Sequence, residues 1–253
     1  MLELRGVRLP MGPETPISLE FEAGSITAII GPSGSGKSLL LAAVARRFSP
    51  PGDIRIAGRP LCGITRKEYP LYISYFDGSA PADIGDTLYD FLLLARAHMK
   101  RFLYPYGEHH LQAADSAIEA FDLGEYRARV LGTLPSDALR RALIALSMLR
   151  DSELLLMDDP VAGLGIHSMG IVQRALARYT MSGDRTVVFA SGDLSFAAQT
   201  ADRILVMEGG AVVGDIPPES LDADIIRRYF KTEVLVSRNI YNGRPEVHFF
   251  PGT

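Results

Sequence analysis

The chain has 253 residues, 47% of them hydrophobic and 22% charged, with a formal net charge of −4. These values are typical of a globular protein with at most two domains. They provide no basic surface field for nucleic acid or anionic lipid, so we expect no nucleic-acid partner.

The cysteine content and the hydropathy pattern indicate the compartment. Cys62 is the only cysteine, which excludes an internal disulfide and a thiolate metal site and is consistent with a reducing compartment. The first residues lack a signal-peptide pattern, and no apolar run approaches the roughly 18 residues of a membrane span. We therefore expect a cytoplasmic protein, which could still dock on a membrane protein.

In chain order, the first predicted elements alternate between strand and helix. Residues 25–30 are a short β-branched run that ends at a glycine and predicts a buried strand. Residues 38–48 follow with the apolar stripe of a helix. Residues 50–61 predict a turn, a short strand and a second turn, and residues 71–76 predict another buried strand.

The middle of the chain has a different character. Residues 87–148 show helical patterns interrupted by polar turns. Three buried strands are predicted after it, at residues 153–158, 185–191 and 203–208, with helical segments between them. Strands that alternate with helices predict a largely parallel α/β sheet, with the helical middle inserted into it. After Pro217 a short helix precedes strand-like and turn-like pieces in which we identify no chemistry.

The stretch GPSGSGKS at residues 31–38 matches the pattern G-x-x-x-x-G-K-[ST] and lies between a predicted strand and a predicted helix. Such glycines let the backbone wrap around phosphates, and N–H groups at the helix N-terminus donate to the anion. Lys37 should reach the β- and γ-phosphates, and the Ser38 hydroxyl should ligate Mg²⁺. A chance Gly/Ser turn is the alternative, and the flanking strand and helix argue against it. The residues predicted to bind the nucleotide are Ser33, Gly34, Ser35, Gly36, Lys37, Ser38 and Leu39.

A phosphate-binding loop of this kind also needs an acid at the end of a neighbouring buried strand. Asp158 follows the apolar run of residues 153–157 and would hold Mg²⁺ through water. The alternative is that Asp158, Asp159 and Pro160 merely form a turn after the strand.

With the phosphate loop, the helical middle and LLLMDDP in this order, the chain resembles the ATP-binding-cassette (ABC) family of ATPases over residues 2–230. Residues 117–149 are similar to the stretch that contains the family's signature motif. The resemblance implies an α/β fold of the P-loop NTPase class, with a RecA-like core, an antiparallel β subdomain and an inserted helical subdomain. The implied cassette covers residues 1–230, with the helical subdomain at about 85–150 and a C-terminal extension at 231–253.

The resemblance also implies partners. ABC ATPases form a head-to-tail dimer that holds ATP between the phosphate loop of one subunit and the signature of the other. In transporters, the helical subdomain and the loop before it contact a membrane permease. We therefore expect an ATP-binding subunit of an ABC-type transport complex, with ATP and Mg²⁺ as cofactors. Its partners would be a second ABC ATPase subunit and an integral membrane permease, at the inner face of the cell membrane.

Two departures from the family pattern concern catalysis. The signature, Leu-Ser-Gly-Gly-Gln, aligns with residues 134–138. There Pro135 removes a backbone donor and the serine hydroxyl, and Asp137 puts a carboxylate where an anion should arrive. The family's catalytic glutamate aligns with Asp159. Its side chain is one methylene shorter, although a catalytic base must come within about 2.6–3.2 Å of the attacking water.

Further departures surround the expected nucleotide. The switch histidine aligns with Gly192, and the aspartate of the loop after the catalytic acid aligns with Gly165. The glutamine of the metal-sensing loop aligns with Asp77, which could still ligate Mg²⁺ through an oxygen. No aromatic residue is available near Pro10 or Met11 to stack on adenine. We expect ATP binding with weakened or absent intrinsic hydrolysis.

Other functions remain as alternatives. A homodimer would have the altered signature at both sites, which favours pairing with a different cassette. A non-hydrolysing nucleotide-sensing or structural subunit of a soluble assembly is the second hypothesis. A small-molecule kinase is the third, and it is disfavoured because no acceptor site is visible in the sequence.

Five further residues have candidate roles. His109 and His110 have no third metal ligand at suitable spacing and predict a polar loop. His167 could replace the switch histidine but lies on the wrong element. Arg140, with its neighbour Arg141, either positions the helix after the signature or lies on a solvated face.

Overall fold

The apolar run before the glycine-rich loop forms a central strand. In the computed structural model, which describes all residues except 11, 13–14, 80–84, 97–105 and 250–253, this strand is completely buried. It belongs to a six-stranded sheet in the order β10-β9-β3-β8-β7-β6. All pairs in this sheet are parallel except β9 with β10. Its strands are β3 (Ile26–Ile30), β6 (Ile73–Phe76), β7 (Leu154–Asp158), β8 (Thr186–Ala190), β9 (Arg203–Glu208) and β10 (Ala211–Ile216).

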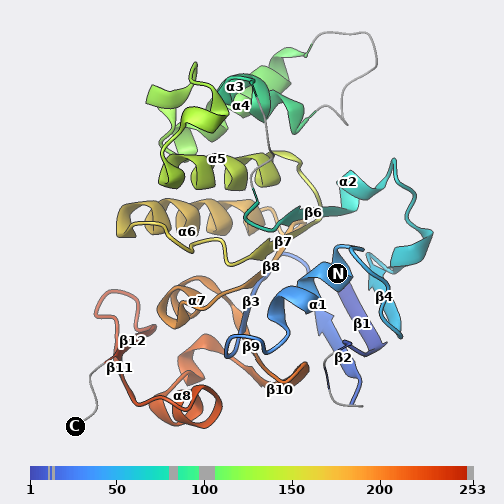
Figure 1. Ribbon diagram of the computed structural model, residues 1–253, viewed down its shortest axis with the longest axis vertical. Coiled ribbons are helices and arrows are strands. Elements are labelled where there is room, and N and C mark those ends of the chain that lie inside the picture. The colour runs from blue at the N-terminus through green and yellow to red at the C-terminus, as the bar shows by residue number, and fades with distance from the viewer. Residues whose placement is uncertain (11, 13–14, 80–84, 97–105, 250–253) are drawn as a thin grey trace.

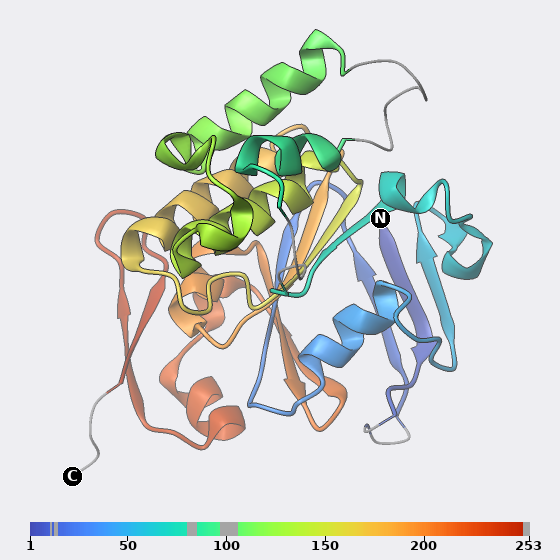
Figure 2. The same cartoon turned by 45° about the horizontal axis from the view of Figure 1, so that its top comes forward.

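A second sheet is antiparallel and has the order β2-β1-β4-β5. In Figures 1 and 2 it lies beside α1, on the side of the molecule opposite the C-terminal hairpin. Its strands and the neighbouring short helices are β1 (Leu2–Val7), β2 (Ile17–Phe21), β4 (Asp53–Ile56), β5 (Arg59–Pro60), η1 (Leu61–Gly63) and α2 (Tyr69–Tyr72).

The two faces of the six-stranded sheet contribute to different hydrophobic cores. Ile29 of β3 packs with α1 and the antiparallel sheet. Ala28 and Ile30, on the other face of the same strand, pack with the larger helices. Because successive side chains of a strand point to opposite faces, a strand covered on both sides reads as a continuous apolar run. This is why the sequence of residues 153–158 predicted a buried strand.

The helices form a layer over one face and a separate group above it. Figure 1 shows α6 nearest the sheet, α5 above it, and α3 and α4 at the top. α5 contacts α3, α4, α6 and β6. The helices and remaining short turns are α1 (Lys37–Val44), α3 (Leu88–Leu94), α4 (Glu108–Ala120), η3 (Gly124–Tyr126), η4 (Leu131–Thr133), α5 (Ser136–Leu149), α6 (Ile166–Thr180), α7 (Leu194–Thr200), η5 (Pro218–Ser220) and α8 (Ala223–Phe230).

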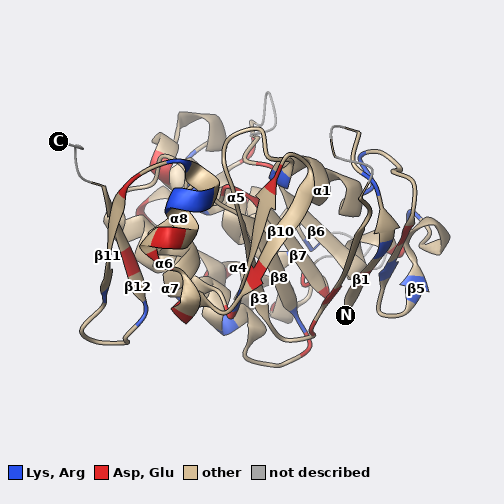
Figure 3. Ribbon diagram, turned by 90° about the horizontal axis from the view of Figure 1, so that it is seen from below, with Lys and Arg blue, Asp and Glu red and all other residues tan. Residues whose placement is uncertain are grey.

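The C-terminal residues form a hairpin of β11 (Val234–Arg238) and β12 (Pro245–Phe249) that packs on α7. The amide of Gln199 donates to the carbonyl oxygens of Arg244 and Pro245, at 3.3 and 3.1 Å. Figure 3 shows α8 beside this hairpin, with acidic and basic residues on the same helix. The strand-like pieces in the sequence are therefore one hairpin attached to the core.

The α/β fold with an antiparallel β subdomain and an inserted helical subdomain is confirmed. The first predicted helix is shorter than expected: it ends at Val44, and Arg46 has a φ of 55° in the left-handed region. No helix in the described parts of the chain is both long and apolar enough to cross a membrane.

Candidate nucleotide-binding site

The glycine-rich loop connects β3 to α1 and depends on glycine at two points. Gly31 has a φ of 155°, and a Cβ atom there would lie 2.2 Å from the carbonyl oxygen of Met207. Gly36 caps α1 with a φ of 101°, a conformation that costs an L side chain energy. The loop can therefore pass close to β9 and still place the first N–H groups of α1 at the end of the sheet, where an anion would be bound favourably.

Lys37 is the first residue of α1, and its side chain folds back over the loop. The ammonium donates to the carbonyl oxygens of Gly31 and Pro32, at 2.8 and 3.0 Å, and to the Ser35 hydroxyl at 3.4 Å. Burial lowers the pKa of Lys37, while the carboxylates of Asp158 and Asp159 oppose the shift. A cation so placed is able to exchange its carbonyl acceptors for phosphate oxygens.

Ser38 and Asp158 meet across the end of the sheet. The Ser38 hydroxyl donates to the Asp158 carboxylate at 2.9 Å, so the loop and the end of β7 are in direct contact. Burial raises the pKa of Asp158, the hydrogen bond from Ser38 opposes this, and the charge of Asp159 adds to it. A divalent cation would offset the cost of holding these acids together, which fits the predicted Mg²⁺.

Asp77 follows β6 and reaches the same region. Its carboxylate accepts hydrogen bonds from the Ser79 N–H at 3.0 Å, from the Ser79 hydroxyl and from Arg47 at 3.3 Å. Burial opposes the shift, but these hydrogen bonds lower the pKa of Asp77. Within the described residues no three His, Cys, Asp or Glu side chains form a metal cluster by themselves. A magnesium ion here would also need phosphate oxygens or water as ligands.

Asp159 is held by its backbone on both sides. Its φ of 48° lies in the left-handed region, which Asp tolerates better than most residues. Its N–H donates to the carbonyl oxygen of Ala190 at 2.9 Å, and its own carbonyl accepts from Arg140. Its carboxylate has no hydrogen-bond partner among the residues that the structure describes.

One cleft of about 540 Å³ brings these groups together. Four of the predicted nucleotide-binding residues line it, as do the three predicted acids and Gly192. Its lining residues are Gly31, Ser33, Gly34, Lys37, Ser38, Asp77, Gly78, Arg140, Asp158, Asp159, Ala190, Ser191 and Gly192. Ser35 is buried beneath Lys37, and the Leu39 side chain packs toward the antiparallel sheet, so Leu39 could offer only its backbone.

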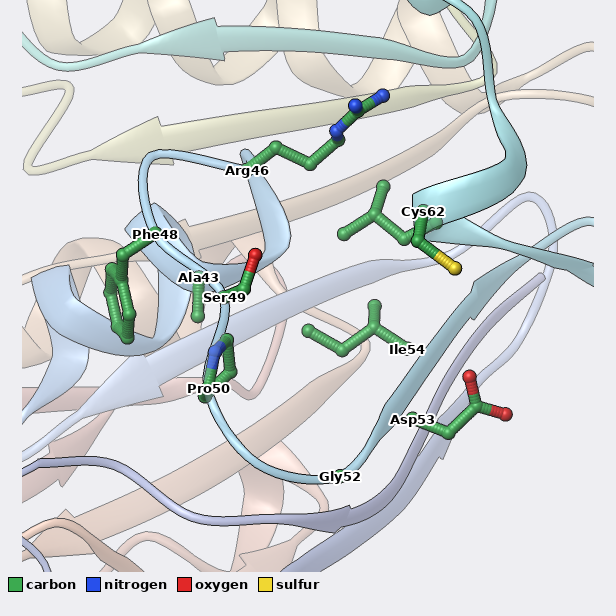
Figure 4. Close-up of a pocket in the computed structure, with 10 residues that line it drawn as sticks. Ala43, Arg46, Phe48, Ser49, Pro50, Gly52, Asp53, Ile54 and Cys62 are labelled. Carbon is green, nitrogen blue, oxygen red and sulfur yellow. The ribbon is translucent and has the colours of Figure 1, made fainter.

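A second cavity, of about 190 Å³, lies between the end of α1 and the antiparallel sheet (Figure 4). Its walls include Phe48, Asp53, Ile54 and Cys62, and it shares no lining residue with the larger cleft. The guanidinium of Arg46, also at its wall, donates to the Ile64 carbonyl oxygen at 2.6 Å. This cavity presents no phosphate-binding backbone, so the larger cleft is the nucleotide candidate.

Arg140 is a cleft residue whose role the sequence left open. Its Nε donates to the Pro160 carbonyl oxygen at 3.0 Å, a second nitrogen donates to the carbonyl of Asp159, and its guanidinium lies 5.4 Å from the centre of the Phe76 ring. Arg141 is buried and donates to the carbonyl oxygens of Phe121 and Asp122. Only the packing of α5 in the folded chain shows that these two neighbours have different partners.

The histidines do not join the site. His109 and His110 lie in the first turn of α4, so the predicted polar loop is wrong; His110 is buried and accepts a hydrogen bond from Arg96 at 3.1 Å. His167 is exposed and lies 3.4 Å from Asp122, outside the cleft. Of the two residues considered near adenine, Pro10 is exposed and Met11 lies outside the described residues.

The loop, the lysine and the hydroxyl–carboxylate pair at the edge of a parallel sheet define a phosphate-loop nucleotide-binding protein. Comparison with known proteins narrows the class. The family model for "ABC transporter" matches residues 15–162. The chain therefore belongs to the ABC transporter family, as the resemblance implied.

The relatives cover nearly the whole chain. The petrobactin import ATP-binding protein YclP of Bacillus subtilis is 25% identical over 98% of this chain and 100% of its own length. The hemin import ATP-binding protein HmuV of Nocardia farcinica is 30% identical over 85% of this chain and 74% of its own length.

Solved structures agree on the fold. A metal-chelate type ABC transporter in an inward-facing conformation aligns with a TM-score of 0.80 at 19% identity, over 100% of this chain and 97% of that one. The cassette MJ0796, in a dimeric post-hydrolysis state bound to ADP and Pi, aligns with a TM-score of 0.75 at 21% identity, over 86% and 98%.

Proposed function

We propose that the chain is the ATP-binding subunit of an ABC-type import complex and that it binds Mg-ATP at residues 31–38. The observation that carries this proposal is the meeting of Lys37, Ser38 and Asp158 at one cleft. A cation, a hydroxyl and a carboxylate around a helix N-terminus suit a magnesium-bound polyphosphate, because Mg²⁺ prefers hard oxygen ligands and shares them with phosphates.

The binding steps follow from the contacts of the loop. The N–H groups at the start of α1 would donate to the phosphates, and Lys37 would turn from the carbonyls of Gly31 and Pro32 toward phosphate oxygens. Ser38 and Asp158 would hold the metal, and Asp77 at the edge of the cleft would offer a further oxygen ligand. When bound, Mg²⁺ neutralises charge on the β- and γ-phosphates.

We propose that intrinsic hydrolysis is weak or absent. Asp159 occupies the position of the catalytic base, and both of its backbone polar groups are already hydrogen-bonded, to Ala190 and Arg140. The main chain is therefore restrained from moving toward a water that the shorter side chain does not reach. Gly192, at the switch position, lines the cleft with backbone alone.

The partners and cargo of the proposed complex come from its relatives. Their names describe import of petrobactin and hemin, so we propose import of a siderophore or a hemin. The cassette would bind a permease at the cytoplasmic, inner face of the cell membrane and would pair with a second, different cassette. We propose that this cassette covers residues 1–230, with the helical subdomain at about 85–150 and residues 231–253 as an extension.

The second candidate is a nucleotide-sensing or structural subunit of a soluble assembly that does not hydrolyse ATP. Two altered positions support this candidate. At Asp159 the longer base that would act on water is missing, and at Gly192 the side chain that would contact the γ-phosphate is missing.

The first experiment measures ATP binding and phosphate release by the purified chain and by Lys37→Ala. Loss of the ammonium should weaken Mg-ATP binding at least tenfold, since hydrogen bonds to charged groups contribute about 1.5–3 kcal/mol each. Lys67→Ala, at an exposed position outside the cleft, should bind as the unmodified chain does. Equal affinity in Lys37→Ala and Lys67→Ala would refute the phosphate-loop assignment.

A pull-down from native membranes separates the two candidates. Recovery of a permease together with a second cassette supports the import complex, whereas recovery of a soluble assembly alone supports the sensor. Transfer of phosphate to a metabolite with neither partner would contradict both.

A further inference from the structure

Helix α6 starts without a cap of its own. Its N-cap is Gly165, which has no side chain to accept a hydrogen bond, and its first turn contains no acidic residue. The N-terminus of a 15-residue helix leaves N–H groups unsatisfied and has a partial positive charge. A carboxylate from elsewhere would therefore stabilise this end of the helix.

That carboxylate comes from α5. Asp137 accepts a hydrogen bond from the Gly165 N–H at 3.3 Å and from the Ser168 hydroxyl at 2.8 Å. Ser168 stands three residues after the N-cap, where a capping box has a Glu or Gln that accepts from the N-cap N–H. Here Ser168 instead holds the acid that does so, and one half of a capping box is supplied by another helix.

The same carboxylate is also bound within α5. Arg141, buried and one turn further along, donates from Nε to Asp137 at 2.9 Å. It also donates to the carbonyl oxygens of Phe121 and Asp122 at the end of α4. Asp137 lies in the first turn of α5, where a negative charge is favourable as well. We name Asp137, Arg141, Gly165 and Ser168 the α5–α6 junction.

The junction changes the interpretation of Asp137 from the sequence. The carboxylate at the start of the signature helix has three donors inside its own chain, of which Arg141 is positively charged. These hydrogen bonds lower the pKa of Asp137 although burial opposes the shift. How strongly this carboxylate repels a neighbouring phosphate stays a prediction.

Together with Arg140, the junction holds both ends of one loop. Residues 159–165 connect β7 to α6 and contain Asp159. Arg140 binds the carbonyl groups of Asp159 and Pro160 at the start of this loop, and Asp137 binds Gly165 at its end. The first turns of α5 thus set the position of the loop that contains the candidate catalytic acid.

We infer that Asp137 is a positioning residue: it replaces the missing cap of α6 and, with Arg140, fixes the loop of residues 159–165 against the signature helix. The inference deepens the proposed function, because it rests on that function for the role of Asp159. Its physical part, the shared cap, does not depend on ATP.

The test introduces a capping side chain at Gly165, the N-cap position of α6 itself. Gly165 has a φ of −72°, and a Cβ atom there would meet nothing within 4 Å, so Gly165→Asp can supply a local N-cap. Asp137→Ala should lower the Tm by at least about 2–4 °C, since buried Arg141 also loses its partner, and hydrogen exchange in the first turn of α6 should become roughly fivefold faster. Gly165→Asp combined with Asp137→Ala should restore slow exchange in α6 but only part of the Tm, because buried Arg141 stays without its carboxylate.

The double-mutant cycle decides the result. In the unmodified chain Gly165→Asp should not stabilise, because two carboxylates would then share one site. Gly63→Asp, at another open glycine, should not rescue Asp137→Ala. Equal effects of Gly165→Asp in both backgrounds, or unchanged exchange in Asp137→Ala, would overturn the inference.

Two further measurements keep the outcomes separate. If Asp137→Ala does not fold, Ser168→Ala removes only the hydroxyl that holds the carboxylate, and it should show the same change in exchange at α6 to a smaller extent. Mg-ATP binding should be unchanged in every variant of the cycle, so lost binding in Lys37→Ala tests the proposed function alone. If the chain releases phosphate, Asp137→Ala should lower the kcat of release and leave KM unchanged. Adding Gly165→Asp to Asp137→Ala should restore the kcat.

Discussion

Asp159 is the residue on which the proposed weakness of hydrolysis rests, through one missing methylene and two backbone hydrogen bonds. The shorter side chain alone could be compensated by a shift of the main chain. That shift is restrained because the N–H of Asp159 is bonded to Ala190 and its carbonyl to Arg140. The reach of the side chain therefore decides whether a base comes within about 2.6–3.2 Å of water.

Asp159→Glu is therefore expected to raise phosphate release, by up to about 10²–10⁴-fold if general-base catalysis is what is lacking. The increase should require a partner cassette with an intact signature, and it is measured by phosphate release with and without that partner. Asp159→Gln, which has the length without the charge, is the matched control and should stay inactive. An increase in the isolated chain would contradict our view of the signature.

At the scale of elements, the short connection from β8 to α7 both lines the cleft and caps the helix. Strand β8 ends at Ala190. The next two residues, Ser191 and Gly192, line the cleft, and α7 begins directly after Asp193. The Asp193 carboxylate accepts from the Phe196 N–H at 2.7 Å and caps α7. The hairpin β11–β12 packs on the same helix, so this cap supports both the switch position and the C-terminal extension.

Asp193→Ala should lower the free energy of unfolding by about 1 kcal/mol, the usual contribution of an N-cap. Urea denaturation measures the loss, and Asp184→Ala, at an exposed position with no hydrogen bond in the described structure, is the control. Limited proteolysis should cut the hairpin faster in Asp193→Ala than in Asp184→Ala. Identical unfolding midpoints for the two variants would exclude the capping role.

At the scale of the whole molecule, Asp137 and Asp215 bind donors on other elements and make folding sensitive to pH. Asp137 faces Arg141, the Gly165 N–H and the Ser168 hydroxyl, and its pKa is lowered. Asp215 on β10 pairs with Arg203 on β9, and this hydrogen bond lowers its pKa. A carboxyl group whose pKa is lower in the folded chain stabilises folding above its unfolded pKa, near 3.8.

We therefore expect stability to be highest above about pH 4 and to be lost as the pH falls through the lowered folded pKa values. The measurement is the urea midpoint at pH 7, 4 and 3, without nucleotide. Asp215→Asn should lower the midpoint at pH 7 and flatten the decrease between pH 4 and 3. If the unmodified chain and Asp215→Asn lose stability in parallel over this range, the linkage to Asp215 is wrong.

The local pattern of the sequence was sufficient for the fold class and for the core of the candidate site. The buried strands read as apolar runs because both faces of a parallel sheet are covered, and residues 31–38 form a pattern whose chemistry depends on neighbours along the chain. Topology then explains why Asp158 lies near Ser38: parallel strands end at one edge of the sheet. The assigned roles of these residues stay predictions until nucleotide binding is measured.

Only the tertiary structure decided the partners of Asp137, Arg140 and Arg141. These three residues lie on one helix, and the sequence predicts the helix but not which elements cross it. Arg140 contacts the loop after β7, Arg141 the end of α4, and Asp137 the start of α6. The physical reason is that hydrogen bonds between elements depend on distances that chain folding creates. The sequence predicted an altered signature residue at Asp137, and the folded chain adds that its carboxylate binds Gly165 and Ser168 at the start of another helix.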